Sequence, residues 1–215
     1  MSAIPLEDAI ERGAAVERSA KLPPKALAYF LLVACAAIAV TTPFLVDLQA
    51  TTTGWLEFGL LAAGVAVAQF FVVRTPGNKS YHTTGVFLIA AALLVSPGLL
   101  ALIPLIQHIP EWLRSRGTWY VQTTNILVFT IATMAAWGAA EVTLRADGLV
   151  ASDDARFALA GTAAAIVLVV LNSALIAPMI RLVNGHPMRQ LFSYQTLSTE
   201  FVFAALGVVL AAFWM

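Results

Sequence analysis

Few side chains in this sequence could bind or react, and the most conspicuous of them interrupt long apolar stretches. These four polar residues are Gln69, Asn125, Asn172 and Glu200. Polar groups at depth in a membrane are costly and usually face the interior of a helical bundle. Two interpretations follow: the side chains bridge helices by hydrogen bonds, or they line a site for a polar ligand or ion. Glu200 matters in both, because a carboxylate at depth must be protonated or paired.

Other reactive residues do not form recognisable sets. His82, His108 and His186 lack i,i+4 partners, so we expect interfacial anchoring and no metal site. Cys35 is the only cysteine, which excludes a disulfide within the chain. The sequence holds no P-loop, no dinucleotide fingerprint, no Ser/His/Asp or Cys/His arrangement and no paired-carboxylate motif. We therefore expect no cofactor, no catalytic residue and no enzyme activity in this chain.

The composition identifies the environment of the elements that must position these residues. Of 215 residues, 60% are hydrophobic and 11% are charged, against about 25% charged residues in soluble domains. Lipid must cover much of this apolar surface, so we expect an all-α, polytopic membrane bundle. The bilayer is the expected partner, with a small-molecule ligand and a second copy of the chain as further candidates. The net charge of zero gives no global attraction to nucleic acid.

Hydrophobic runs of about 20 residues predict the membrane-spanning helices. Five full-length spans are expected, at residues 26–46, 55–73, 119–144, 157–180 and 194–215. A further apolar region, residues 86–109, is interrupted by Ser96-Pro97-Gly98. It is either one helix with a proline kink or a short helical hairpin over residues 81–113.

The positive-inside rule favours the hairpin. With a cytoplasmic N-terminus, the hairpin places 10 Lys and Arg residues inside and 2 outside, whereas a single kinked span gives 8 and 4. We therefore predict about seven helices within a transmembrane domain at residues 23–215. Residues 1–22 are expected to be a cytoplasmic segment, either an amphipathic helix or a disordered tail. This topology puts all four polar residues in the cytoplasmic half of the membrane.

Several local patterns together resemble one bacterial family. They are the interrupted apolar pair at residues 86–113, Arg114-Ser115-Arg116, Trp119-Tyr120 before Thr124-Asn125, and Leu171-Asn172-Ser173 late in a span. The pattern is similar to the multi-pass sensor regions that precede GGDEF diguanylate cyclase or HD-GYP phosphodiesterase domains. It is also similar in arrangement to the vitamin-binding S components of energy-coupling-factor transporters.

The first resemblance implies a signal-input module of a bacterial inner membrane that passes a membrane or small-molecule cue to an output domain. The second implies a small-solute binding or transport subunit, with the four polar residues as its site. No GGDEF, HD-GYP or kinase motif is present in the 215 residues. The last span is expected to carry residue 215 to the outer face, so we expect a longer parent protein with another helix and a cytosolic output domain.

Overall fold

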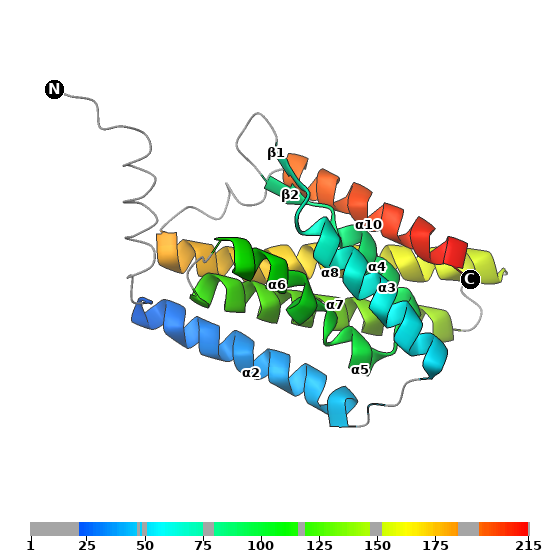
Figure 1. Cartoon of the computed structure of the whole chain (residues 1–215), viewed down its shortest axis with the longest axis horizontal. Coiled ribbons are helices and arrows are strands. Elements are labelled where there is room, and N and C mark those ends of the chain that lie inside the picture. Colours follow the sequence, from blue (N-terminus) through cyan, green and yellow to red (C-terminus); the bar gives the residue numbers. More distant parts are fainter. Residues whose placement is uncertain are drawn as a thin grey trace.

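The computed structural model describes residues 22–46, 48, 51–74, 80–115, 119–146, 152–184 and 194–214. Its helices and strands, labelled in Figure 1, are α2 (Pro24–Val46), α3 (Thr52–Ala68), β1 (Val72–Arg74), β2 (Ser80–His82), α4 (Thr84–Leu94), α5 (Pro97–Leu100), α6 (Ile103–Ser115), α7 (Trp119–Arg145), α8 (Asp153–Asn184) and α10 (Tyr194–Trp214). The all-α bundle expected from the sequence is confirmed. The N-terminal segment, residues 1–22, lies outside the described residues except for Leu22.

The interrupted apolar region is broken, as predicted. Helix α4 ends at Leu94, and Val95 and Ser96 are extended, with ψ angles of 142° and 146°. The break falls just before Pro97, because proline disfavours helical geometry at the preceding residue. Pro97 itself starts the short helix α5, where its missing amide hydrogen costs nothing. Pro97 and Gly98 therefore lie in α5, just after the break, and do not form the turn themselves.

The second predicted span is shorter than expected. Helix α3 has 17 residues, and Val72–Arg74 forms a strand paired antiparallel with Ser80–His82. The apolar run at residues 55–73 predicted a single helix, because valine is equally apolar in a helix and in a strand. Since Val72 and Val73 are β-branched, an extended strand suits them better than a helical end. This hairpin was not predicted, and it also shortens the first arm of the interrupted region, which starts at Thr84.

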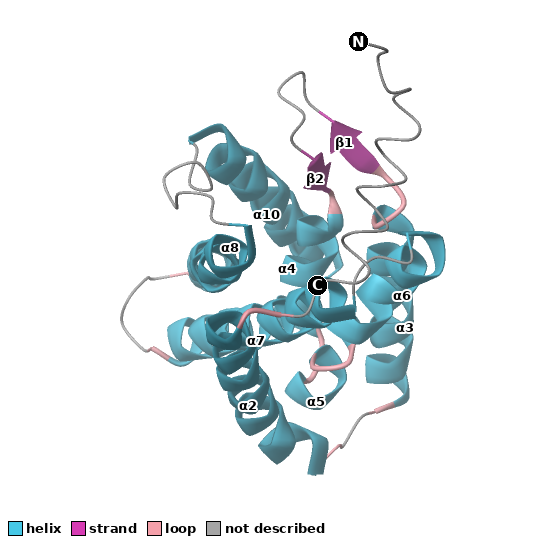
Figure 2. Cartoon of the chain, turned by 90° about the vertical axis from the view of Figure 1, so that its left-hand side faces the viewer, coloured by secondary structure: helices cyan, strands magenta, loops and turns pink. Residues whose placement is uncertain are grey.

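Helix α4 lies at the centre of the molecule, in contact with α3, α7, α8 and α10 (Figure 2). Four consecutive side chains, from Leu88 to Ala91, are completely buried. Leu99 and Leu100 of α5 extend this core. A helix of 11 residues is too short to span a bilayer, and its position explains how it is tolerated: protein surrounds it on all sides.

Four described helices are long and apolar enough to cross a membrane: α2, α7, α8 and most of α10. Their outward faces carry large apolar side chains; Leu32 is 66% exposed, and Ile38 is 63% exposed. Exposed apolar surface of this extent is unfavourable in water and is what a bilayer covers. The chain is therefore a multi-pass membrane protein.

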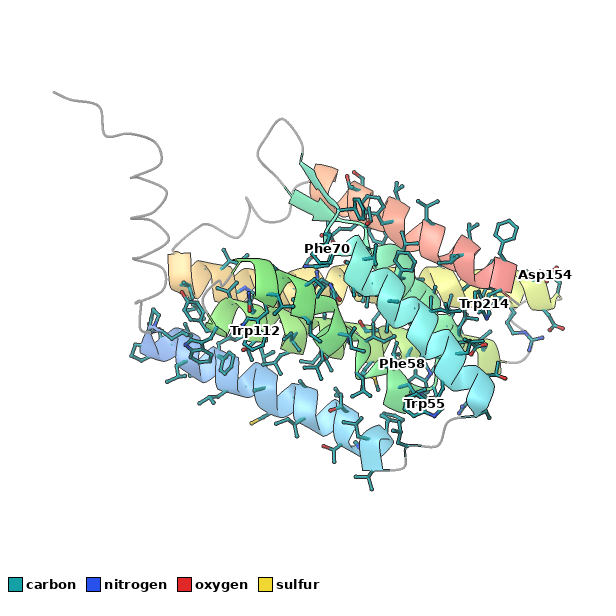
Figure 3. All side chains as sticks on the ribbon, in the orientation of Figure 1. Trp55, Phe58, Phe70, Trp112, Asp154 and Trp214 are labelled. Atoms are coloured by element: carbon teal, nitrogen blue, oxygen red, sulfur yellow. The ribbon has the colours of Figure 1, made fainter. Side chains whose placement is uncertain are left out.

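Two ends of the bundle can be distinguished in Figure 3, and we name each after a labelled residue. At the Trp214 end lie Trp55 and Asp154; at the opposite end lies Trp112. A hydrogen bond from Trp214 Nε1 to Glu57 Oε1, 3.3 Å long, links α10 to α3 at the first end.

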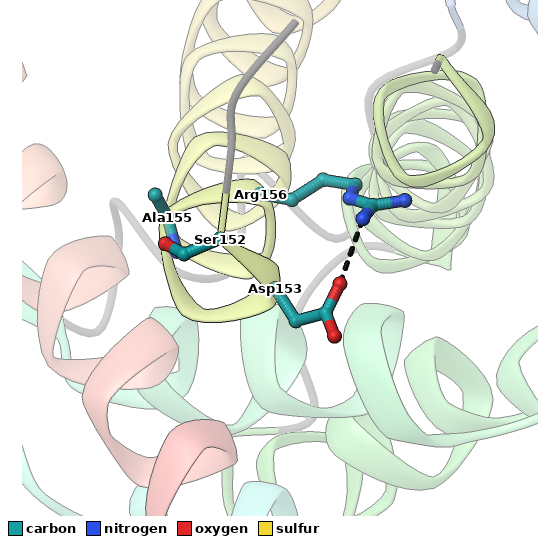
Figure 4. Close-up of polar contacts among 4 residues, drawn as sticks. All are labelled: Ser152, Asp153, Ala155 and Arg156. Carbon is teal, nitrogen blue, oxygen red and sulfur yellow. Dashed lines mark hydrogen bonds and ion pairs between the residues drawn. The ribbon is translucent and has the colours of Figure 1, made fainter. Parts of the chain in front are cut away.

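Charged side chains at the Trp214 end form short-range pairs within single helices. Glu141 and Arg145 form an i,i+4 ion pair at 2.7 Å. At the start of α8, Arg156 pairs with Asp153 at 2.7 Å (Figure 4). Ser152 caps the same helix, accepting a hydrogen bond from the Ala155 amide at 3.2 Å. These pairs are exposed or half-exposed, and they stabilise the helix ends they belong to.

Candidate functional site

The four polar residues singled out in the sequence do not form one hydrogen-bonded cluster. Gln69 directly follows α3 and is 7% exposed, whereas Asn125, Asn172 and Glu200 are half-buried. Among the described residues, no hydrogen bond joins any two of the four. Their role in ligand binding stays a prediction, but direct bridging between them is not observed.

Asn125 and Asn172 nevertheless lie at a similar level of the bundle. Among the described residues, helices α7 and α8 make the most extensive helix–helix contact. The two helices are joined by a short connection after Arg145 and are antiparallel, so residues equally far from it lie side by side. Asn125 is 20 residues before Arg145, and Asn172 is 19 residues after Asp153. The shared depth expected from the sequence is retained for this pair.

Gln69 instead belongs to a polar group that the sequence did not indicate. Its Nε2 donates a hydrogen bond of 2.9 Å to Glu111 Oε2 on α6. One helical turn before Glu111, Gln107 Nε2 donates a longer bond, of 3.4 Å, to Thr84 Oγ1 on α4. We call Gln69, Thr84, Gln107 and Glu111 the polar corner. It joins three helical segments that are remote in sequence.

Burial makes the polar corner chemically distinctive. Gln107 is 1% exposed and Thr84 is 2% exposed, while Glu111 is half-buried. The Oε1 atoms of Gln69 and Gln107 are buried and accept no hydrogen bond within the described part of the chain. A buried acceptor without a donor costs about 1–3 kcal/mol. The corner therefore offers two amide oxygens ready to accept from a ligand.

His108 was expected to anchor the chain at the membrane interface, and this expectation is wrong. The residue is 2% exposed, and its Nδ1 lies 2.9 Å from the Pro104 carbonyl oxygen. Its ring packs on Phe129 of α7, with centroids 5.6 Å apart. The amphipathic helix α6 turns this face inward, toward α7. For His82 only the backbone, in β2, is described, and His186 lies outside the described residues.

An aromatic belt at the membrane interfaces is only partly present. Trp55, Trp112 and Trp119 are 48–63% exposed, as interfacial side chains should be. Tyr120 is 5% exposed and packs in a small cluster with Ala26 and Met179. Because adjacent helical residues point in directions about 100° apart, Trp119 can face outward while Tyr120 faces the bundle.

The two corner residues on α6 were not identified from the sequence, although their spacing is a recognisable pattern. Gln107 and Glu111 have i,i+4 spacing, which places both on one face of a helix. Both residues fall in the apolar region predicted as a hairpin over residues 81–113, where no polar face was expected. The partners of that face, Gln69 and Thr84, lie 42 and 23 residues away. Only the fold shows that these side chains meet.

Comparison with known proteins adds no assignment: no family model, no curated protein and no solved structure matches the chain. Within the described residues, no group of three or more His, Cys, Asp or Glu side chains could hold a metal ion. The fold and the polar corner therefore define the protein only by class. It is a helical membrane protein with a buried, oxygen-rich polar group between α3, α4 and α6.

Proposed function

We propose that the chain is a membrane-embedded signal-input module that binds a small polar ligand at the polar corner and has no catalytic activity of its own. The observation that carries the proposal is the pair of buried amide oxygens, on Gln69 and Gln107, that accept no hydrogen bond among the described residues. A ligand donating to both would contact α3 and α6 together. Binding would then favour one arrangement of these helices, which is how a ligand shifts a conformational equilibrium.

The alternative is a small-solute binding or transport subunit, similar in arrangement to a vitamin-transporter S component. The break at Val95 and Ser96, where the buried Ser96 Oγ has no hydrogen-bond partner among the described residues, favours this alternative. Interrupted helices with polar groups at membrane depth are typical of solute sites in transporters. The two functions share the ligand site and differ in whether the ligand crosses the membrane.

A ligand screen with the purified full chain tests both. Thermal unfolding in lipid nanodiscs is followed with a panel of amines, amino acids, nucleosides and water-soluble vitamins. We expect at least one compound to raise the unfolding temperature of the wild type and not that of Gln107→Leu. Asn172→Leu is the matched control, an amide removed away from the corner, and should keep the response. If no compound stabilises the wild type, or if Gln107→Leu responds equally, the site assignment fails.

Proteoliposomes then separate the two functions. A compound that binds without accumulating in the vesicles supports signal input, whereas its accumulation supports transport.

We place the protein in a bacterial inner membrane with its N-terminus and the Trp112 end on the cytoplasmic side. Lys25 and Arg181 are exposed near this end, in agreement with an excess of positive charge on the inner side. Fusions at residue 215 test the orientation. Alkaline phosphatase should be active there and GFP dark, while a fluorescent GFP fusion would reverse the assignment.

A further inference from the structure

Helix α8 changes its packing partners at an internal proline. Pro178 lies inside α8, close to the end of the helix. Before the proline, side chains such as Leu168 and Val169 pack in the main hydrophobic core. After it, the α8 side chains belong to a separate small cluster with residues of α2 and of α7; these α8 members are Met179, Leu182 and Val183. Among the described residues, the boundary between the two clusters therefore falls at the proline.

The proline also weakens α8 at this boundary. Because Pro178 has no amide hydrogen, the Ala174 carbonyl oxygen loses its usual helical donor. The neighbouring carbonyl oxygen, of Leu175, accepts a hydrogen bond of 2.7 Å from the Tyr29 hydroxyl on α2. Side chains of neighbouring helices commonly stabilise the backbone beside a proline in a membrane helix. Tyr29 thus bonds α2 to the turn of α8 that lacks one of its own hydrogen bonds.

The start of α2 packs on the end of α8 and on the start of α7. Ala26 is completely buried in the small cluster, together with Tyr120 of α7. The Phe30 ring meets Trp119 edge-to-face, with centroids 5.7 Å apart. Figure 1 shows the start of α2 and the end of α8 at the same end of the molecule. Residues 179–184 are therefore held by α2 and α7, outside the main core.

We propose that Pro178 is a hinge in α8, and that the hydrogen bond from Tyr29 to Leu175 holds this hinge in the observed arrangement. Prolines are the usual sites of sharp bending in helices. Leu175 lies on the core side of the hinge, so the bond joins the core part of α8 to α2. Without it, the start of α2 and residues 179–184 would move together relative to the main core, because the small cluster joins them.

This inference goes beyond the proposed function. The polar corner lies on α4, on α6 and at the end of α3, whereas the hinge and its hydrogen bond belong to α8 and α2. The hinge would therefore operate with or without a ligand at the corner. It gives the bundle a moving part at the end where α2 begins and α8 ends.

Hydrogen–deuterium exchange of the full chain in lipid nanodiscs, followed by mass spectrometry, tests the hinge. Backbone amide exchange reports local opening. In Tyr29→Phe, the amides of residues 179–184 should exchange about fivefold faster than in the wild type, the factor by which one hydrogen bond typically shifts an opening equilibrium. The amides of residues 160–169, in the main core, should keep the wild-type rate.

A second tyrosine provides the matched control. Tyr120 lies in the same small cluster, and its hydroxyl makes no hydrogen bond within the described part of the chain. Tyr120→Phe should therefore leave exchange unchanged in both segments of α8. Acceleration of residues 179–184 as large as in Tyr29→Phe would show that any loss of a hydroxyl loosens the cluster, and the role given to the Tyr29 bond would fail.

Pro178→Ala distinguishes a hinge from a helix end that is merely loosely packed. Alanine restores an amide hydrogen that can bond to the Ala174 carbonyl oxygen, so α8 gains a continuous set of helical bonds. Introduced into Pro178→Ala, Tyr29→Phe should no longer accelerate the exchange of residues 179–184. A bond that only supports packing would give the same acceleration with and without the proline.

Three results would overturn the hinge. The first is no acceleration of residues 179–184 in Tyr29→Phe. The second is equal acceleration on both sides of Pro178, which would make the bond a support of the whole helix. The third is an undiminished effect of Tyr29→Phe in the Pro178→Ala background. Because no ligand is added, these results are independent of the ligand screen and leave the proposed function to be decided by that screen.

Discussion

Two regions hold the central helix α4 in contrasting ways. On one side, α10 packs on α4 and α8 through glycines: a Cβ added at Gly207 would lie 2.4 Å from the Val86 carbonyl oxygen, and one at Gly161 2.5 Å from Val208 Cγ1. We call this contact the glycine seam. On the other side, the polar corner joins α4 to α6 and α3 to α6 through side-chain hydrogen bonds.

This contrast indicates which region of the molecule can respond to a ligand. In the glycine seam, the Gly207 and Gly161 backbones lie so close to the Val86 carbonyl group and the Val208 side chain that no side-chain atom fits between them. In the polar corner, long side chains make the contacts, and their bonds can be exchanged for bonds to a ligand at modest cost. We therefore expect the contacts of the glycine seam to stay fixed when a ligand binds, and those of the polar corner to change. In this sense the seam is a fixed frame and the corner is adjustable.

Gly207→Ala should have the largest effect. The new methyl group would meet the Val86 carbonyl oxygen, a backbone atom that cannot move aside without shifting α4. We expect a loss of about 2 kcal/mol in the free energy of unfolding, measured in mixed micelles with increasing SDS. Gly138→Ala is the control, because nothing lies within 4 Å of its added Cβ. Equal stabilities of the two variants would show that α10 is not packed on α4 as described.

Gln69→Leu should have a smaller but clear effect on the other side of α4. It removes the donor to Glu111 and leaves that half-buried carboxylate with one bond fewer. We expect a loss of about 1 kcal/mol in the same SDS titration. A loss as large as that of Gly207→Ala would contradict the view that the corner is the adjustable region.

From the sequence, the membrane-spanning helices could be predicted better than the polar corner. Long apolar runs predict α2, α7, α8 and α10 because a bilayer-spanning helix needs a fixed length of apolar residues. The break before Pro97 also followed from local backbone chemistry. Glu141 and Arg145, four residues apart on one helix, needed no knowledge of the fold.

The central position of α4 and the composition of the corner could not be predicted. Short apolar segments look alike whether they face lipid or protein, so burial of Leu88 gives no signal in the sequence. The bond between Gln69 and Glu111 spans 42 residues and depends on α3 lying beside α6. Gln69 stands out in the sequence because of its apolar surroundings, but the partners expected for it, on α7, α8 and α10, are not joined to it by hydrogen bonds.

Glu141→Ala should have a still smaller effect and sets the baseline for both regions. Its partner Arg145 has a side chain that is 78% exposed, so water and salt screen the ion pair. We expect a loss of about 0.3–0.5 kcal/mol that disappears at high salt. A loss above that of Gln69→Leu would mean that the charges of the Trp214 end matter more to the fold than the polar corner does.

The smallest effect should be the energetic coupling between the two regions. The hydrogen bond from Trp214 on α10 to Glu57 on α3 is a side-chain link between helices of the two regions, since Gln69 follows the far end of α3. It is long and exposed, so Trp214→Phe alone should cost about 0.5 kcal/mol. If seam and corner are independent, the unfolding energies of Trp214→Phe and Gln69→Leu should add to within about 0.3–0.5 kcal/mol in the double variant. Glu57→Gln, which keeps an acceptor for the indole, should behave like the wild type in the same cycle. A coupling clearly above that range would show that α3 transmits changes from the corner to the end of α10, and the division into a fixed frame and an adjustable corner would then have to be abandoned.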